Sequence, residues 1–123
     1  MVPHGHISTK WHNNSLYVKA EGPFNIEGAQ LALEKIKKVV TNNAKPMWKR
    51  MDIVNNDTLG EPLVMRVFGE SYLWAFNNGC QATAFVFSNT IQEAMLEQLI
   101  TQHKVNMKAF SCEEAARCWL KAF

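Results

Sequence analysis

The sequence predicts an α/β domain with a five-stranded mixed sheet and four helices, in the order ββαβαβαβα. Short segments with the period-2 pattern of strands alternate with longer segments whose apolar residues recur at helical spacing. The 123 residues are 47% hydrophobic, and no linker, repeat or low-complexity segment divides them, so residues 1–123 are expected to share one core. Strands that alternate with helices pair in parallel through right-handed crossovers, which leaves only the first hairpin antiparallel.

The N-terminal part of the chain predicts a hairpin followed by a helix. Alternate residues are apolar in 7–11 and again in 16–20, and Asn13-Asn14 between them favours a tight turn. Gly22-Pro23 ends the hairpin, and Asn25 caps the helix that follows. That helix has one apolar face, made of Ile26, Ala29, Leu33, Ile36 and Val40.

The middle of the chain predicts a strand, a long helix and a second strand. Residues 47–54 form a strand with mixed faces, and residues 63–77 form an apolar helix with Gly79 as its C′ residue. Residues 82–87 are mostly apolar on both faces, which is typical of a central parallel strand.

Two capping boxes predict the last helices. TIQE at residues 90–93 and SCEE at residues 111–114 open them, with a strand at residues 105–110 in between. The residues expected to face inward are Ile91, Ala94, Met95, Leu96 and Leu99 in the first of these helices and Ala115, Cys118, Trp119 and Ala122 in the second.

The stretch NNDTLGE at residues 55–61 allows two interpretations. Thr58 and Glu61 fit a capping box, so the next helix could start at Thr58. Alternatively the helix starts at Pro62, the favoured first position, and residues 57–60 form a separate turn. A phosphate on Thr58 would meet free helix N–H groups in the first case and would project into solvent in the second. A plain role as cap or turn residue stays open.

Three motifs in their order along the chain carry a family resemblance. Gly22-Pro23-Phe24-Asn25 fits a turn before the first helix, Asp57-Thr58-Leu59-Gly60 resembles an Asp-Ser-x-Gly motif before the second, and residues 110–115 (FSCEEA) resemble a strand that runs into a Glu-Glu-Ala helix. Together with the element order, they resemble the STAS-domain fold, and more narrowly the small stand-alone bacterial proteins called SpoIIAA-like.

The resemblance implies a non-catalytic regulatory or protein-binding module similar to anti-sigma-factor antagonists. It makes Asp57, Thr58 and Gly60 a candidate switch or anion site, with threonine where the antagonists usually have a serine phosphoacceptor. The fold also resembles Sec14-type lipid carriers, so a carrier or sensor of a small apolar or anionic ligand is the alternative.

Aromatic residues of the second helix form a candidate partner or pocket surface. Phe68, Tyr72 and Phe76 recur every four residues, and Trp74 points elsewhere, so this helix is apolar on more than one side. Trp48 on the preceding strand could belong to the same surface. The surface would be a homodimer face, a protein-binding face or an apolar pocket; plain core is the alternative.

Charge and motif content narrow the classes of function. The net charge is only +2, so nucleic acid is not expected as the partner. No Walker, Rossmann, Gly-x-Ser-x-Gly or His-Glu-x-x-His motif is present, so no enzyme and no cofactor are expected. The basic residues do cluster locally, which suits either an anionic partner or a solvated helix end: Lys35, Lys37, Lys38, Lys45, Lys49 and Arg50.

The remaining polar residues give weaker signals. His4, His6 and His12 could share one strand face as metal ligands, but an exposed polar edge accounts for them and no metal is expected. Cys80, Cys112 and Cys118 are odd in number and form no CxxC pair, which indicates reduced thiols buried as small apolar side chains. No signal peptide and no apolar run of about 20 residues are present, so a cytoplasmic protein without membrane insertion is expected.

Overall fold

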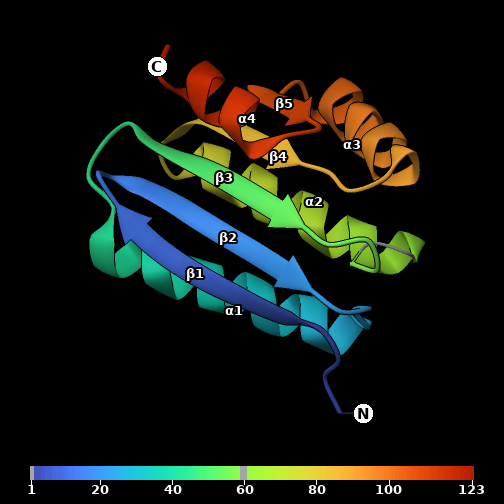
Figure 1. Cartoon of the computed structure of the whole chain (residues 1–123). Coiled ribbons are helices and arrows are strands. Elements are labelled where there is room, and N and C mark those ends of the chain that lie inside the picture. Colours follow the sequence, from blue (N-terminus) through green and yellow to red (C-terminus); the bar gives the residue numbers. More distant parts are fainter. Residues whose placement is uncertain (1, 59–60) are drawn as a thin grey trace.

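The computed structural model describes residues 2–58 and 61–123 and has the predicted element order (Figure 1). The elements are β1 His6–His12, β2 Ser15–Glu21, α1 Ile26–Asn43, β3 Trp48–Val54, α2 Pro62–Asn77, β4 Cys80–Val86, α3 Thr90–His103, β5 Met107–Phe110 and α4 Glu113–Leu120.

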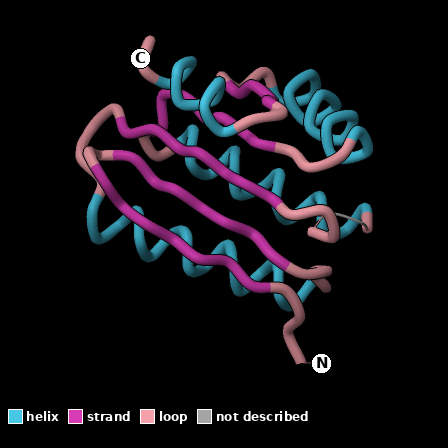
Figure 2. Tube along the Cα trace, in the orientation of Figure 1, coloured by secondary structure: helices cyan, strands magenta, loops and turns pink. Residues whose placement is uncertain are grey.

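The five strands lie side by side in sequence order, as Figure 2 shows. β1 and β2 are antiparallel, and every later pair is parallel, which confirms the mixed sheet. Because each parallel strand is added on the same side of the previous one, right-handed crossovers carry their helices over one face of the sheet. α1 and α2 lie behind the sheet in Figure 1, and α4 lies in front of it.

The core has two unequal parts. The larger one lies between the sheet and α1, α2 and α3, and it includes Leu16, Ile36, Val64, Phe85 and Leu96. The smaller one lies under α4, where Ala116 and Leu120 pack on Met51, Ala84 and neighbouring side chains. Among the helices of the described residues, none lies over the front of β1 and β2, so this part of the sheet faces solvent.

The predicted turn and cap residues have the expected conformations in the hairpin, at the start of α1 and after α2. Asn13 and Asn14 both have φ near +55° (50° and 57°), which is the backbone of the tight hairpin turn that Asn tolerates. Asn25 is the N-cap of α1, and its Oδ1 accepts hydrogen bonds from Gly28 N and His4 N, both at 2.8 Å. Gly79 has φ +96°, as expected of a C′ residue.

Both later helices begin one position away from the predicted cap. The side chain of Asn89, not Thr90, caps α3, and Cys112, not Ser111, caps α4. Asparagine is a stronger cap than threonine, which accounts for α3.

The predicted inward faces of α3 and α4 are confirmed in part, because Leu96 is buried and Met95, Leu99 and Trp119 pack against the core. α3 buries Gln92 and Leu96, and leaves Ile91 68% exposed. α4 buries Ala116 and Leu120, whereas Ala115 and Cys118 are exposed. Among the helices of residues 2–58 and 61–123, none has the length and apolarity needed to cross a membrane.

Candidate functional site

The loop after β3 resolves the choice between the two helix starts. α2 begins at Pro62, and the side chain of the N-cap residue Glu61 makes no capping hydrogen bond. Asp57 and Thr58 therefore belong to a separate turn, in which Thr58 N donates to Asn55 O at 3.3 Å. Gly60, the third residue of the candidate switch site, lies outside the described residues.

Thr58 is fully buried, although a separate turn was expected to expose it. Its Oγ1 lies 3.0 Å from Ala20 O at the end of β2 and 2.5 Å from Asn55 Oδ1. The turn therefore folds back onto the sheet edge, and the expectation that Thr58 projects into solvent is wrong. Asp57 is exposed beside it.

Gln92 holds the same turn from the other side. This side chain of α3 is fully buried; its Nε2 donates to Asn55 O at 2.7 Å, and its Oε1 accepts from Ser88 N at 2.7 Å. The hydroxyl of Ser88 in turn donates to Val54 O. Both ends of the amide are thus used, which is what a buried glutamine requires.

Asn89 adds a further link, because its Nδ2 donates to Asn56 Oδ1 at 2.9 Å while its Oδ1 caps α3. These side chains join the carboxyl ends of β2, β3 and β4. We call them the carboxyl-edge network: Asn55, Asn56, Thr58, Ser88, Asn89 and Gln92. Of this network, the sequence analysis identified only Thr58. A glutamine in the first turn of α3, beside Ser88 and Asn89, was the available sign of the other members.

A second buried polar cluster ties β3 to α2. The guanidinium of Arg50 forms a bidentate pair with Asp52, with Nε to Oδ1 at 2.7 Å and Nη2 to Oδ2 at 2.9 Å. Arg50 Nη1 also donates to Ser71 Oγ at 2.8 Å, and the hydroxyl of Tyr72 donates to Asp52 Oδ2 at 3.0 Å. The prediction that places Arg50 in a basic surface cluster is therefore wrong.

The environment of this cluster fixes its protonation. Burial, and then the nearby carboxylate of Asp52, raise the pKa of Tyr72 well above its usual value. Burial, the largest single influence, would lower the pKa of Arg50, but the attraction of Asp52, its hydrogen bond and the neighbouring Tyr72 and Cys80 together outweigh burial and raise the pKa. Burial also raises the pKa of the Cys80 thiol. Tyr72 and Cys80 thus stay protonated and Arg50 stays charged near neutral pH, which fits a structural cluster.

Most of the predicted aromatic surface is core. Phe68, Tyr72 and Trp48 are at most 4% exposed, so they cannot form a surface for a partner. The Trp48 indole donates to Asn78 O at 2.9 Å, which satisfies its only polar group. Phe76 is 48% exposed and Trp74 is half-buried, so these two alone could contact another molecule.

The remaining candidate residues do not form one site. Lys35 and Lys49 each donate to a backbone carbonyl, of Ile7 and Leu120 respectively, so the basic cluster is divided. Contrary to expectation, Cys112 and Cys118 are exposed; only Cys80 is buried. Within the described ranges no three His, Cys, Asp or Glu side chains are placed to hold a metal ion. His4, His6 and His12 lie exposed along and before β1.

The surface of the described residues has open grooves, two of which adjoin helices. One, of about 550 Å³, lies between α2 and α3 and has Met65, Gly69, Leu73, Met95 and Leu99 among its lining residues. The other, of about 450 Å³, lies on the uncovered sheet face beside α4.

Comparison with protein-family models gives no match to the sequence, and comparison with curated protein sequences gives none either. Solved structures do match over the whole fold. A DUF3478-family protein with a SpoIIAA-like fold from Shewanella loihica PV-4 has a TM-score of 0.67 at 14% identity, covering 98% of this chain and 96% of that one. An anti-sigma factor antagonist from Mycobacterium paratuberculosis has a TM-score of 0.67 at 12% identity, covering 96% and 95%.

The chain therefore has the SpoIIAA-like, or STAS-like, α/β fold. This confirms the fold that the three sequence motifs and the element order predict. At 14% and 12% identity the likeness establishes the fold and not the activity.

Proposed function

We propose that this chain is a non-catalytic regulatory module that binds a protein partner through the carboxyl edge of its sheet, around Asp57 and the start of α2. The observation that carries the proposal is the end-to-end match to an anti-sigma factor antagonist, combined with the position of the Asp57-Thr58 turn between β3 and α2. Exposed side chains surround this turn, including Asp57, Glu61 and Leu63, the last of which is 50% exposed.

The carboxyl-edge network suggests how modification could regulate such binding. The hydroxyl of Thr58 donates to one of two neighbouring oxygens, Ala20 O or Asn55 Oδ1. A phosphate ester would replace this donor with acceptor oxygens that face both of them. Phosphorylation of Thr58 would therefore drive the turn away from the sheet edge and alter the binding surface.

The experiment that tests the proposal is capture from extract of the source cells with the immobilised chain. Asp57→Lys changes an exposed acid in the turn, and Glu34→Lys makes the same change on α1, where the Glu34 side chain is 71% exposed. The proposal predicts a captured protein that Asp57→Lys loses and Glu34→Lys keeps. Equal capture by all three baits would count against it.

A separate measurement addresses the modification. Intact mass of the chain isolated from its source, with and without phosphatase, shows whether a phosphoryl group is present, and peptide mapping shows whether Thr58 carries it. Thr58→Glu is a poor mimic, because it places a carboxylate in a fully buried position. An unmodified Thr58 under every growth condition would remove the phosphorylation mechanism and leave the binding proposal standing.

The groove between α2 and α3 favours a second candidate, a carrier or sensor of a small apolar ligand. Two methionines, Met65 and Met95, line it, and methionine adapts readily to apolar ligands of irregular shape. Native mass spectrometry of the gently isolated chain tests this candidate: an added ligand mass supports it, and a clean protein mass counts against it.

A further inference from the structure

The uncovered part of the sheet follows from the size of α4. This helix has eight residues and so is about 12 Å long, whereas five strands spaced about 4.8 Å apart are wider than that. α4 packs mainly on β3, β4 and β5. The front of β1 and β2 is left open, with a groove of about 450 Å³ between it and α4.

The strand register arranges the floor of this groove. Lys10 on β1 lies opposite Tyr17 on β2, and Lys19 follows two residues later on the same face. Lys19 in turn lies beside Ile53 on β3. Tyr17 and Ile53 are half-buried, so the floor has an apolar strip, and the two exposed lysines lie next to it.

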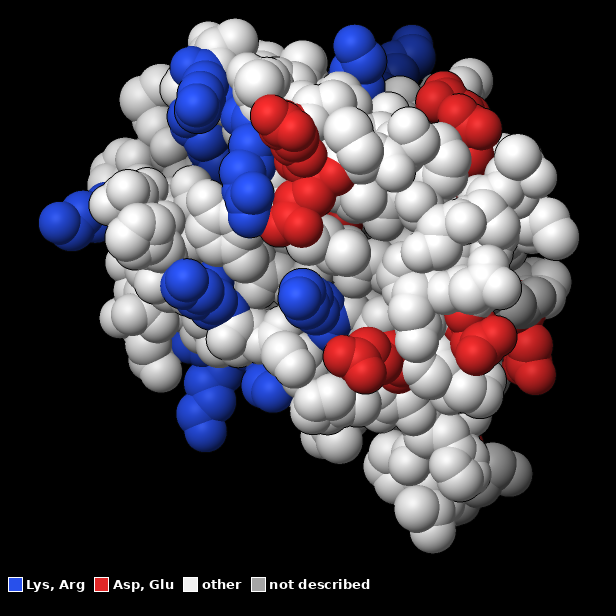
Figure 3. All heavy atoms as spheres, in the orientation of Figure 1, with Lys and Arg blue, Asp and Glu red and all other residues white. Residues whose placement is uncertain are grey.

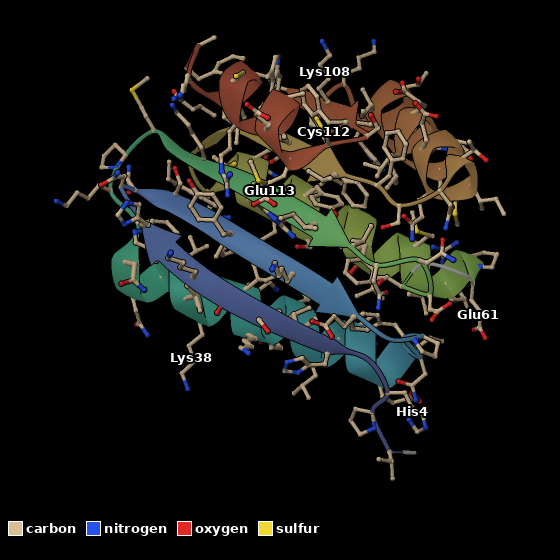
Figure 4. All side chains as sticks on the ribbon, viewed as in Figure 1. His4, Lys38, Glu61, Lys108, Cys112 and Glu113 are labelled. Carbon is tan, nitrogen blue, oxygen red and sulfur yellow. The ribbon has the colours of Figure 1, made fainter. Side chains whose placement is uncertain are left out.

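One wall of the groove comes from α4. Glu113 and Arg117, one helical turn apart, form an ion pair at 2.5 Å. In Figure 4, Glu113 lies where α4 meets the open sheet. We call this feature the sheet-face groove and define it by Lys10, Tyr17, Lys19, Ile53, Glu113 and Arg117.

The sheet-face groove has excess positive charge. Glu113 neutralises Arg117, whereas Lys10 and Lys19 make no ion pair with any residue in the described ranges. These four side chains thus carry three positive charges and one negative charge, a net +2. Figure 3 shows basic side chains, with acidic ones beside some of them, over the part of this face where β1 and β2 run. A ligand that matches the groove is acidic, with an apolar part.

The groove also reaches the candidate site. A shallower depression of about 350 Å³ shares Lys19 and Ile53 with it and is also lined by Glu21 and by Asn55 and Ser88 of the carboxyl-edge network. A bound chain in the groove can therefore continue to the turn that contains Asp57 and Thr58.

We propose that the sheet-face groove binds an acidic segment of the protein partner, in which Asp or Glu side chains flank an apolar one. The carboxylates pair with Lys10 and Lys19, and the apolar side chain packs on Tyr17 and Ile53. This proposal rests on the proposed function, because it names the chemistry of the partner. Such complementary charge speeds association and selects the partner.

The first test uses a defined probe and the full chain. A capped peptide of one phenylalanine flanked by glutamates is titrated into the ¹⁵N-labelled protein, and the same peptide with glutamines is the control. Saturable shifts of the Lys10, Tyr17 and Lys19 amides with the glutamate peptide alone are expected. The proposal would be overturned by equal binding of the glutamine peptide, by shifts confined to another face, or by the absence of a saturable shift. Equal shifts with free glutamate would also overturn it, because they would indicate a site for small anions.

The second test uses charge reversal. Lys10→Glu combined with Lys19→Glu is expected to weaken binding of the glutamate peptide by at least about tenfold. The matched control combines Lys38→Glu with Lys45→Glu at exposed positions outside the groove, and Figure 4 shows Lys38 pointing away from the sheet. The control is expected to bind within about twofold of wild type. Equal loss in both variants would show non-specific attraction and overturn the proposal.

Capture from extract separates this proposal from the proposed function. If the groove variant captures the partner as well as wild type does, the groove proposal fails and the proposed function stands. If wild type captures no protein but binds the glutamate peptide at Lys10 and Lys19, the peptide site stands and the proposed function fails.

Discussion

Asp52→Asn tests whether the buried cluster beneath α2 holds the fold together. The carboxylate of Asp52 accepts two hydrogen bonds from Arg50 and one from Tyr72, and only 2% of Asp52 is exposed. Asparagine has one oxygen, and its amide nitrogen would meet the donors of Arg50. The guanidinium would stay buried without a counter-charge, so we expect the free energy of unfolding to fall by about 3–5 kcal/mol. That is a large share of the stability of a typical domain.

Urea unfolding followed by tryptophan fluorescence and circular dichroism measures this loss. The control is the double variant Arg50→Met with Asp52→Leu, which removes both charges and leaves only Ser71 Oγ and the Tyr72 hydroxyl to find other partners. We expect it to be more stable than Asp52→Asn alone. A loss below about 1 kcal/mol for Asp52→Asn, or a double variant less stable than the single one, would refute the assigned role of the pair.

Three further predictions concern single side chains. The pKa of Tyr72 is higher in the folded state than its unfolded value of about 10, so its contribution to stability is complete below that pH and falls as the pH rises above it. Tyr72→Phe should therefore flatten the decrease in unfolding free energy at alkaline pH. Parallel pH profiles of the variant and wild type would contradict this. Thr58→Val removes the hydroxyl that faces Ala20 O and should cost about 1–3 kcal/mol in urea unfolding, whereas Thr58→Ser keeps it and should lose less; the reverse order would exclude the hydrogen bond as the cause. Glu61→Ser supplies the side-chain cap that α2 lacks and should raise the unfolding midpoint by an amount equivalent to about 0.5–1 kcal/mol; an unchanged or lower midpoint would mean that the α2 cap is not limiting.

Local patterns predict most of the fold because the residues responsible act on their near neighbours. Asn13 and Asn14 tolerate the left-handed backbone of the hairpin turn, and Asn25 accepts from an amide three residues on. The apolar spacing of α1 is regular enough to fix its buried face. Such signals require no knowledge of distant parts of the chain.

The faces of α3 and α4 are harder to predict because their apolar patterns are ambiguous. In α3 only Gln92 and Leu96 are buried, and the polar one is held there by Asn55 and Ser88. A pattern that counts apolar residues selects Ile91 instead, which the structure exposes.

The buried polar clusters combine contacts between near neighbours, such as Arg50 and Asp52, with contacts between distant parts of the sequence. Arg50 has a lysine-rich neighbourhood in sequence, but its partner Ser71 lies in α2. Thr58 is a typical cap residue in sequence, yet its hydroxyl reaches Ala20, 38 positions earlier. Neither contact leaves a local pattern, so the sequence places these residues on the surface or at a helix start.

The binding constant between the purified chain and the protein captured from source-cell extract tests the proposed function most directly. Titration calorimetry on wild type, Asp57→Lys and Glu34→Lys provides it, with urea unfolding to verify that both variants are folded. We expect saturable binding that Asp57→Lys weakens by at least about tenfold and that Glu34→Lys leaves within about twofold. Identical constants for the three proteins, or no protein retained above the background of the empty resin, would contradict a partner-binding role for the carboxyl edge.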